Sequence, residues 1–172
     1  MGVEIERKFL VDSDKVKKIL DIGQGTTLCQ SYLSTDTDRT VRVRSVQRKE
    51  SSYGKAVAKG FITIKGRTRK ITRTEYEYEI PIKDAIHMIN NMCVGSIIIK
   101  HRFNIFHMSK CWEVDFFFGE NYGLVVAEVE LSYEHEEVVK PDWVLEEVSD
   151  QGKYFNSRLA KNPYKNWRNS SA

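Results

Sequence analysis

The charged residues of this chain occur in same-sign pairs, two positions apart, within segments that otherwise alternate between charged and apolar side chains. Arg42 and Arg44, for example, flank Val43. Side chains two apart on a β-strand point to the same face, so each charged pair occupies one face and the apolar residues the other. The pattern therefore predicts strands, and it predicts that one face of each strand carries charge of mainly one sign.

This spacing recurs along the whole chain. For any single strand, a polar face in contact with water is the simpler interpretation. For the set it is disfavoured, because like charges on one face repel unless an opposite charge lies between them. Carboxylate pairs then need a cation, and guanidinium pairs need an anion such as phosphate. The basic set contains the pairs Arg42/Arg44 and Lys100/Arg102, with Lys8, which shares a face with Glu4 and Glu6, and Lys65, which stands alone. The acidic members are Glu4, Glu6, Glu77, Glu79, Glu113, Asp115, Glu128 and Glu130.

Hydrophobic periodicity and turn residues predict the order of the elements. So many strands in one small chain need closure or cover. We therefore expect an α+β fold: a closed eight-stranded antiparallel β-barrel with a few flanking helices, forming a single domain over residues 1–172. Residues 48–60 are predicted to be a mobile loop and residues 166–172 a frayed tail. Strands are predicted over residues 1–11, 26–34, 40–47, 61–65, 72–82, 97–108, 111–118 and 124–133, and helices over 15–22, 84–92, 141–148 and 153–161.

The bulk properties exclude several classes of protein. No apolar run is long enough to cross a bilayer, and the first residues do not resemble a secretory signal peptide. Cys29, Cys93 and Cys111 are odd in number and far apart, which favours a reducing compartment over a disulfide framework. We therefore expect a cytoplasmic protein without a membrane partner. The net charge of +3 is too small to favour nucleic acid as a partner.

The balance of charge predicts what could bind inside such a barrel. If every charged face points inward, the eight acidic and six basic side chains leave a net charge of −2. One or two divalent cations would compensate for it, and two would attract an anion of roughly −4 to −5, the charge that phosphate pKa values give a triphosphate. Ligation by carboxylates alone favours Mg²⁺ or Mn²⁺ over zinc.

The N-terminal motif Glu4-Ile-Glu-Arg-Lys8 resembles the ExExK signature of the CYTH superfamily, the triphosphate tunnel metalloenzymes. Later segments resemble the family's remaining strands in the same order, so the similarity covers essentially the whole chain. It is greatest with the small bacterial members that hydrolyse inorganic triphosphate. These segments are Val41-Arg-Val-Arg44, Ile64-Lys65, Glu77-Tyr-Glu-Ile80, Lys100-His-Arg-Phe103, Glu113-Val-Asp115 and Ala127-Glu-Val-Glu-Leu131.

The resemblance implies a tunnel open at both ends, and it allows for a homodimer. Glu4, Glu6 and Lys8 would be catalytic, with one of the glutamates orienting or deprotonating the attacking water. The residues expected to bind phosphate are Lys8, Arg42, Arg44, Lys65, Lys100 and Arg102, and those expected to hold metal are Glu4, Glu6, Glu77, Glu79, Asp115, Glu128 and Glu130.

The expected reaction is metal-dependent hydrolysis of inorganic triphosphate to pyrophosphate and phosphate. Thiamine triphosphatase, nucleoside or RNA triphosphatase and class IV-type adenylate cyclase activities stay open, because the same metal and phosphate site would serve each of them. Residues 48–60 and Glu75, which depart from the family pattern, leave the choice of substrate open. A polyphosphate-binding module without catalysis is disfavoured, since binding alone would favour a purely basic channel.

Overall fold

The computed structural model describes residues 2–20, 25–50 and 55–170. Its strands are β1 (Gly2–Val11), β2 (Thr26–Asp36), β3 (Arg39–Glu50), β4 (Lys55–Gly66), β5 (Thr72–Ile80), β6 (Val94–His107), β7 (Lys110–Phe118), β8 (Val125–Glu130) and β9 (Val144–Glu147). The α-helices are α1 (Ser13–Lys17), α2 (Ile82–Asn91) and α3 (Asn156–Leu159), and the 3₁₀ helices are η2 (Gly119–Asn121), η3 (Gly152–Tyr154) and η4 (Tyr164–Ser170).

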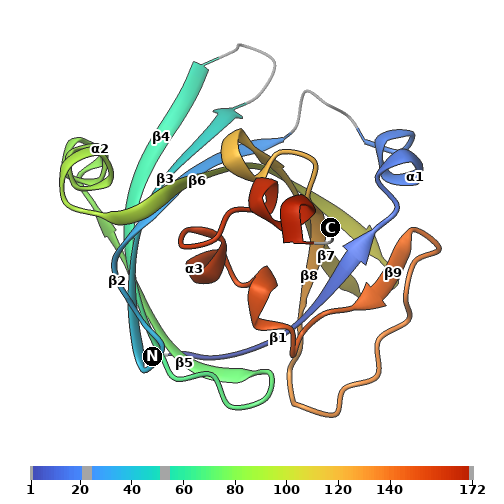
Figure 1. Cartoon of the computed structure of the whole chain (residues 1–172). Coiled ribbons are helices and arrows are strands. Elements are labelled where there is room, and N and C mark those ends of the chain that lie inside the picture. Colours follow the sequence, from blue (N-terminus) through green and yellow to red (C-terminus); the bar gives the residue numbers. More distant parts are fainter. Residues whose placement is uncertain (1, 21–24, 51–54, 171–172) are drawn as a thin grey trace.

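Eight of the strands close into an antiparallel barrel, which confirms the predicted fold class. The sheet runs in the order β5-β4-β3-β2-β6-β7-β8-β1, and a further pairing between β5 and β1 completes the ring (Figure 1). Closure rests on the first residues of β1, since Gly2–Ile5 pairs with Thr72–Glu75 of β5. The beginning of β1 is therefore built into the barrel wall.

The ninth strand corrects one prediction. Residues 141–148 were expected to be helical, yet β9 pairs with the second half of β1, at Phe9 and Val11. Because β5 accompanies only the first half of β1, the second half would otherwise present an unpaired edge. Strand β9 covers that edge, and this tertiary pairing overrides the helical spacing of the local sequence.

The predicted loop at residues 48–60 is also corrected. Strands β3 and β4 stay paired as far as Glu50 and Lys55, so most of this segment is a long hairpin, and residues 51–54 lie outside the described part. Continuous backbone pairing outweighs the weak strand propensity of its polar side chains. Helix α1 begins at Ser13, two residues before the predicted start, and Asp12 caps it by accepting a hydrogen bond from Lys15 N at 3.1 Å. It ends at Lys17, and Ile22, the predicted end, lies outside the described residues. Helix α2 confirms the prediction for residues 84–92 with a start two residues earlier.

The outward faces of the strands supply two hydrophobic clusters. One gathers Phe9, Trp112 and Val129 beneath α1 and the segment that leads into β9, and the other joins β3 to α2. Arg7 breaks the apolar alternation of β1, and the structure gives the reason. Its guanidinium makes two hydrogen bonds to Glu147 of β9, at 2.9 and 2.5 Å.

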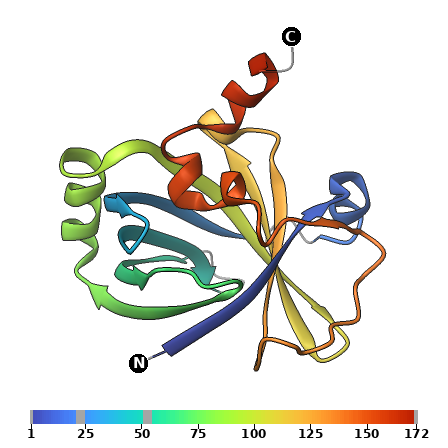
Figure 2. The same cartoon turned by 60° about the horizontal axis from the view of Figure 1, so that its bottom comes forward.

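The C-terminal segment lies over one end of the barrel (Figures 1 and 2). Figures 1 and 2 show η3 and α3 lying across the ring of strands. Tyr154 and Leu159 pack there against inward-facing Tyr32 and Ile98. Residues 166–170, expected to be frayed, belong to η4, where Trp167 contacts the ring of Tyr154. Within the described residues, no helix is long and apolar enough to span a bilayer.

Candidate active site

The inward faces of the strands surround a cavity of about 510 Å³. All the predicted site residues line it except Lys100, Glu79 and Asp115. Three further charged residues, Arg73, Glu75 and Glu113, join them. The cations that line the cavity are Lys8, Arg42, Arg44, Lys65, Arg73 and Arg102, and the carboxylates are Glu4, Glu6, Glu75, Glu77, Glu113, Glu128 and Glu130.

The strand register explains why these side chains meet. Residues directly opposite each other in an antiparallel pair point to the same face of the sheet. Lys8 of β1 lies opposite Glu128 of β8, and Lys65 of β4 lies opposite Glu75 of β5. At these positions opposite charges face each other across strand pairs, whereas Glu6 lies opposite Glu130 and Glu113 lies opposite Glu128.

Glu77 lies between the two arginines of β3. Its Oε2 accepts hydrogen bonds from Arg42 Nη2 at 3.2 Å, from Arg44 Nη2 at 2.9 Å and from Thr63 Oγ1 at 2.7 Å. Burial raises the pKa of Glu77, but Arg44 and the other partners outweigh burial and lower it. Burial and the charge of Arg42 lower the pKa of Arg44 to about 10. The paired arginines are thus crowded cations, held by one carboxylate.

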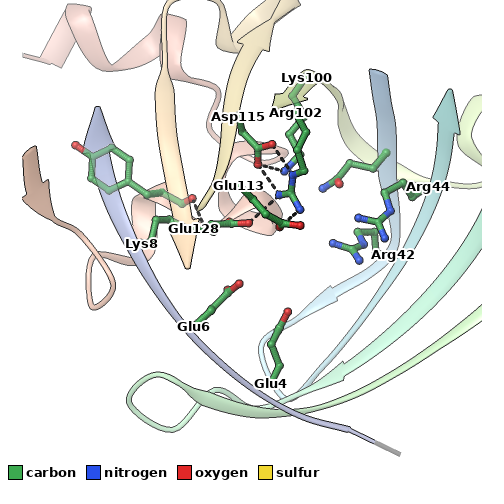
Figure 3. Close-up of polar contacts among 12 residues, drawn as sticks. Glu4, Glu6, Lys8, Arg42, Arg44, Lys100, Arg102, Glu113, Asp115 and Glu128 are labelled. Carbon is green, nitrogen blue, oxygen red and sulfur yellow. Dashed lines mark hydrogen bonds and ion pairs between the residues drawn. The ribbon is translucent and has the colours of Figure 1, made fainter. Parts of the chain in front are cut away.

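Glu128 connects the N-terminal motif to β6. Its carboxylate is 2.8 Å from Lys8 Nζ and 2.8 Å from Arg102 Nη2. Burial works against its charge, yet Lys8, Lys100 and Arg102 hold the pKa of Glu128 well below its usual value. Figure 3 shows these side chains converging from β1, β6 and β8.

Two predicted site residues lie behind the cavity. Lys100 and Asp115 are 1% and 0% exposed, and the Lys100 ammonium bonds to Asp115 Oδ2. Asp115 also accepts two hydrogen bonds from Arg102, at 2.7 and 2.6 Å, and so orients that guanidinium toward the cavity (Figure 3). Glu79 lies beyond the lining residues and pairs with the exposed Lys59 at 3.0 Å.

Sequence reasoning missed Arg73, which faces the motif glutamates. It lies opposite Glu4 in the β1–β5 pairing and bonds to Glu4 and Glu6. Burial lowers the pKa of Arg73, but the charges of Glu6 and Glu4 outweigh burial and raise it. The signal was present, because Arg73 is two residues before Glu75 and four before Glu77, on the same parity of β5.

The donor set suits a hard divalent cation, which prefers oxygen ligands. A smaller cavity of about 120 Å³ is lined by Cys111 and five carboxylates: Glu4, Glu6, Glu113, Glu128 and Glu130. Burial, and then the charges of Glu128 and Glu4, raise the pKa of Glu6. In the described part of the chain, no three acidic, histidine or cysteine side chains are already arranged to hold a metal ion. Lysine and arginine hold several of these carboxylates instead.

Fold and site together define a class: a closed antiparallel barrel that encloses a polar cavity lined by both signs of charge. The chain belongs to the CYTH family, since the CYTH domain model matches residues 2–161. CYTH triphosphatases are in general metal-dependent.

Similar proteins agree with this assignment. An inorganic triphosphatase from Acetivibrio thermocellus is 42% identical over 98% of this chain and 99% of its own. One from Nitrosomonas europaea is 29% identical over 91% of this chain and 96% of its own. A crystal structure of an inorganic triphosphatase superimposes with a TM-score of 0.60 at 28% identity, covering 93% of this chain and 95% of the other. A Pyrococcus furiosus structure, at 17% identity and a TM-score of 0.53, covers 77% of this chain and 80% of its own and shows the fold alone.

Proposed function

We propose that this chain hydrolyses inorganic triphosphate to pyrophosphate and phosphate inside the charged cavity, with Mg²⁺ or Mn²⁺ as cofactor. Two similar proteins named inorganic triphosphatase match nearly all of the chain and support the reaction. The observation that carries the proposal is the convergence of six cationic side chains, from β1, β3, β4, β5 and β6, on one enclosed space. Its volume of about 510 Å³ lies within the range of small-molecule sites.

Unsatisfied hydrogen-bond donors support an anionic substrate. Within the described residues, the Nε atoms of Arg42 and Arg44 are buried and have no hydrogen-bond partner. A buried donor left unpaired costs about 1–3 kcal/mol. Binding of an anion is therefore favoured if the guanidinium groups can turn and donate these hydrogen bonds to it. Guanidinium groups match the geometry of phosphate oxygens, and fixed positive charge stabilises the charge that develops when a phosphoanhydride breaks.

The carboxylates around the smaller cavity would hold the divalent cation, with Glu4, Glu6, Glu128 and Glu130 as its ligands. A bound divalent cation neutralises phosphate charge and lowers the pKa of water. Asp115 and Glu77 suit this role less well, because neither lines the smaller cavity. Glu4 or Glu6 would orient or deprotonate the attacking water, since both lie at the cavity wall on β1.

Phosphate release is the direct test of this function. The purified chain is given triphosphate, thiamine triphosphate or ATP, each with Mg²⁺, with Mn²⁺ and without metal, and cyclic AMP is assayed alongside. We expect metal-dependent release of phosphate, fastest from triphosphate. Faster turnover of thiamine triphosphate or ATP would replace the substrate assignment, and formation of cyclic AMP would replace hydrolysis with cyclisation.

Two substitutions test the assignment of residues. Lys8→Ala and Glu6→Ala should each lower turnover by about 100-fold or more, because Lys8 would bind phosphate and Glu6 would hold the metal or orient the attacking water. Lys83→Ala, which removes an exposed lysine of α2, is the control and should keep wild-type turnover. Circular dichroism should show all three variants folded. Wild-type rates for folded Lys8→Ala or Glu6→Ala would overturn the assignment.

A further inference from the structure

The two glutamates of the N-terminal motif share one guanidinium. Arg73 Nε donates to Glu4 Oε2 at 2.5 Å, and Arg73 Nη2 donates to Glu6 Oε1 at 2.9 Å. The side chain of Arg73 is 20% exposed, and those of Glu4 and Glu6 are 21% and 23% exposed. Figure 3 shows both glutamates directed from β1 into the interior of the barrel. A single cationic group therefore bridges the two carboxylates of the motif.

The strand register holds Arg73 in this place. Glu4 and Arg73 are direct partners in the β1–β5 pairing that closes the barrel, so their side chains point to the same face. Arg73 does not depend on a flexible loop to reach the glutamates. Lys65 also contacts Glu4, at 3.1 Å, but its second carboxylate partner is Glu75, at 2.6 Å. Arg73, in contrast, bonds to both motif glutamates.

We propose that Arg73 is the internal counter-ion of Glu4 and Glu6, and that it competes with divalent cations for these two carboxylates. This inference rests on the proposed function, in which the same glutamates hold the metal. Arg73 occupies one oxygen of each carboxylate, Glu4 Oε2 and Glu6 Oε1, and Lys65 bonds to both oxygens of Glu4. An ion between Glu4 and Glu6 would therefore compete with Arg73 for these oxygens, and the guanidinium charge would repel it.

Metal binding without substrate tests the competition. Mn²⁺ is titrated into the metal-free chain, and free Mn²⁺ is followed by electron paramagnetic resonance. Arg73→Gln removes the competing charge and should bind Mn²⁺ about tenfold more tightly, or more, since a unit charge a few ångströms from a divalent ion costs about 1–2 kcal/mol even at the dielectric constant of water. Arg73→Lys keeps the charge but cannot bridge two carboxylates in the same way. Its affinity for Mn²⁺ should therefore lie between that of the wild-type chain and that of Arg73→Gln.

Arg44→Gln is the matched control. It removes the same charge from the same cavity, but Arg44 bonds to Glu77 and not to Glu4 or Glu6. Its affinity for Mn²⁺ should change less than that of Arg73→Gln. Unfolding midpoints establish that each variant is folded, and Arg73→Lys carries the test if Arg73→Gln does not fold.

The outcomes separate this inference from the proposed function. Tighter Mn²⁺ binding by Arg73→Gln supports the competition even if the wild-type chain releases no phosphate from triphosphate, a result that would overturn only the reaction. Equal or weaker Mn²⁺ binding by Arg73→Gln overturns the competition, because Arg73 would then support the ligands instead of opposing the ion. Equal gains in Arg73→Gln and Arg44→Gln would also overturn it, since cavity charge alone would explain them.

Discussion

Replacing Gly95 by alanine should loosen the C-terminal segment that covers one end of the barrel. Gly95, near the start of β6, has φ +76°, a conformation that costs an L-residue about 1–2 kcal/mol. A Cβ added there would lie 2.6 Å from the carbonyl oxygen of Ala160. That oxygen also accepts a hydrogen bond from Ser96 N at 2.8 Å, so moving it away from the new methyl group weakens this bond.

Gly119 provides a matched comparison. Its φ is +60°, but a Cβ added there would meet nothing within 4 Å. Gly119→Ala should therefore cost only the backbone term, about 1 kcal/mol. Gly95→Ala should cost about 3 kcal/mol in all, because steric overlap and a weakened hydrogen bond are added.

Thermal unfolding measures the difference between the two variants. For a chain of this length, 1 kcal/mol corresponds to about 2–4 °C in Tm, so Gly95→Ala should melt about 4–8 °C below Gly119→Ala. Hydrogen exchange should also accelerate at the Ser96 amide in Gly95→Ala alone. Equal losses of stability in the two variants would refute the steric argument and leave only backbone strain. Since Phe155 and Ser157 of the same segment line the large cavity, Gly95→Ala should also raise the KM for triphosphate.

Two further predictions concern ion pairs. Glu147→Gln should lower the free energy of unfolding by about 1 kcal/mol at neutral pH, since it removes the negative charge and at least one of the two hydrogen bonds from Arg7 in a partly exposed pair. The hydrogen bond from Arg7 lowers the pKa of Glu147, so this stabilisation is present above the unfolded-state pKa and is lost as pH falls through the folded-state pKa. Urea unfolding of both chains at neutral and acidic pH should show the gap closing, and a gap independent of pH would contradict the prediction. Asp115→Asn should destabilise the fold by about 3–5 kcal/mol, because it leaves the buried charges of Lys100 and Arg102 without their shared partner. Lys100→Met should cost less, since Asp115 keeps Arg102, and a larger loss for Lys100→Met would show that the ammonium group is the more important partner.

The alternation of charge along each strand was sufficient to predict the inward faces. The side-chain period of a strand is two, so parity alone assigns Arg42, Glu77 and Glu128 to one surface once the barrel closes. Parity does not specify depth along the barrel axis. Lys100 and Asp115 have the right parity but lie behind Arg102, and Glu79 has it but lies beyond the cavity.

Pairings between distant segments could not be predicted from local pattern. Strand β9 forms because the second half of β1 has a free edge, and that edge depends on where β5 stops pairing. The hairpin of β3 and β4 continues through polar residues because each strand supplies the other with backbone partners. Arg73 is a different case, since its parity with Glu75 and Glu77 indicated the inward face, and only its pairing with Glu4 depends on the register.

The same-sign pairs also lead to a different conclusion from the one that the sequence alone favours. Taken strand by strand, each pair needs a counter-ion from outside the chain. In the folded barrel the neighbouring strands provide it, because Glu77 holds Arg42 and Arg44 while Arg73 holds Glu4 and Glu6.

The cavity is therefore almost neutral without ligand, with six cations against seven carboxylates. A phosphate that binds to the arginines of β3 would break their ion pairs with Glu77. A cation that binds to the motif glutamates would break their ion pairs with Arg73. Each released group has the charge that the other ligand needs. If both ligands bind as proposed, anion and cation should each raise the affinity for the other, by the same factor in both directions. An interior of paired charges would then select a metal–triphosphate complex over either component alone, which a purely basic channel could not do.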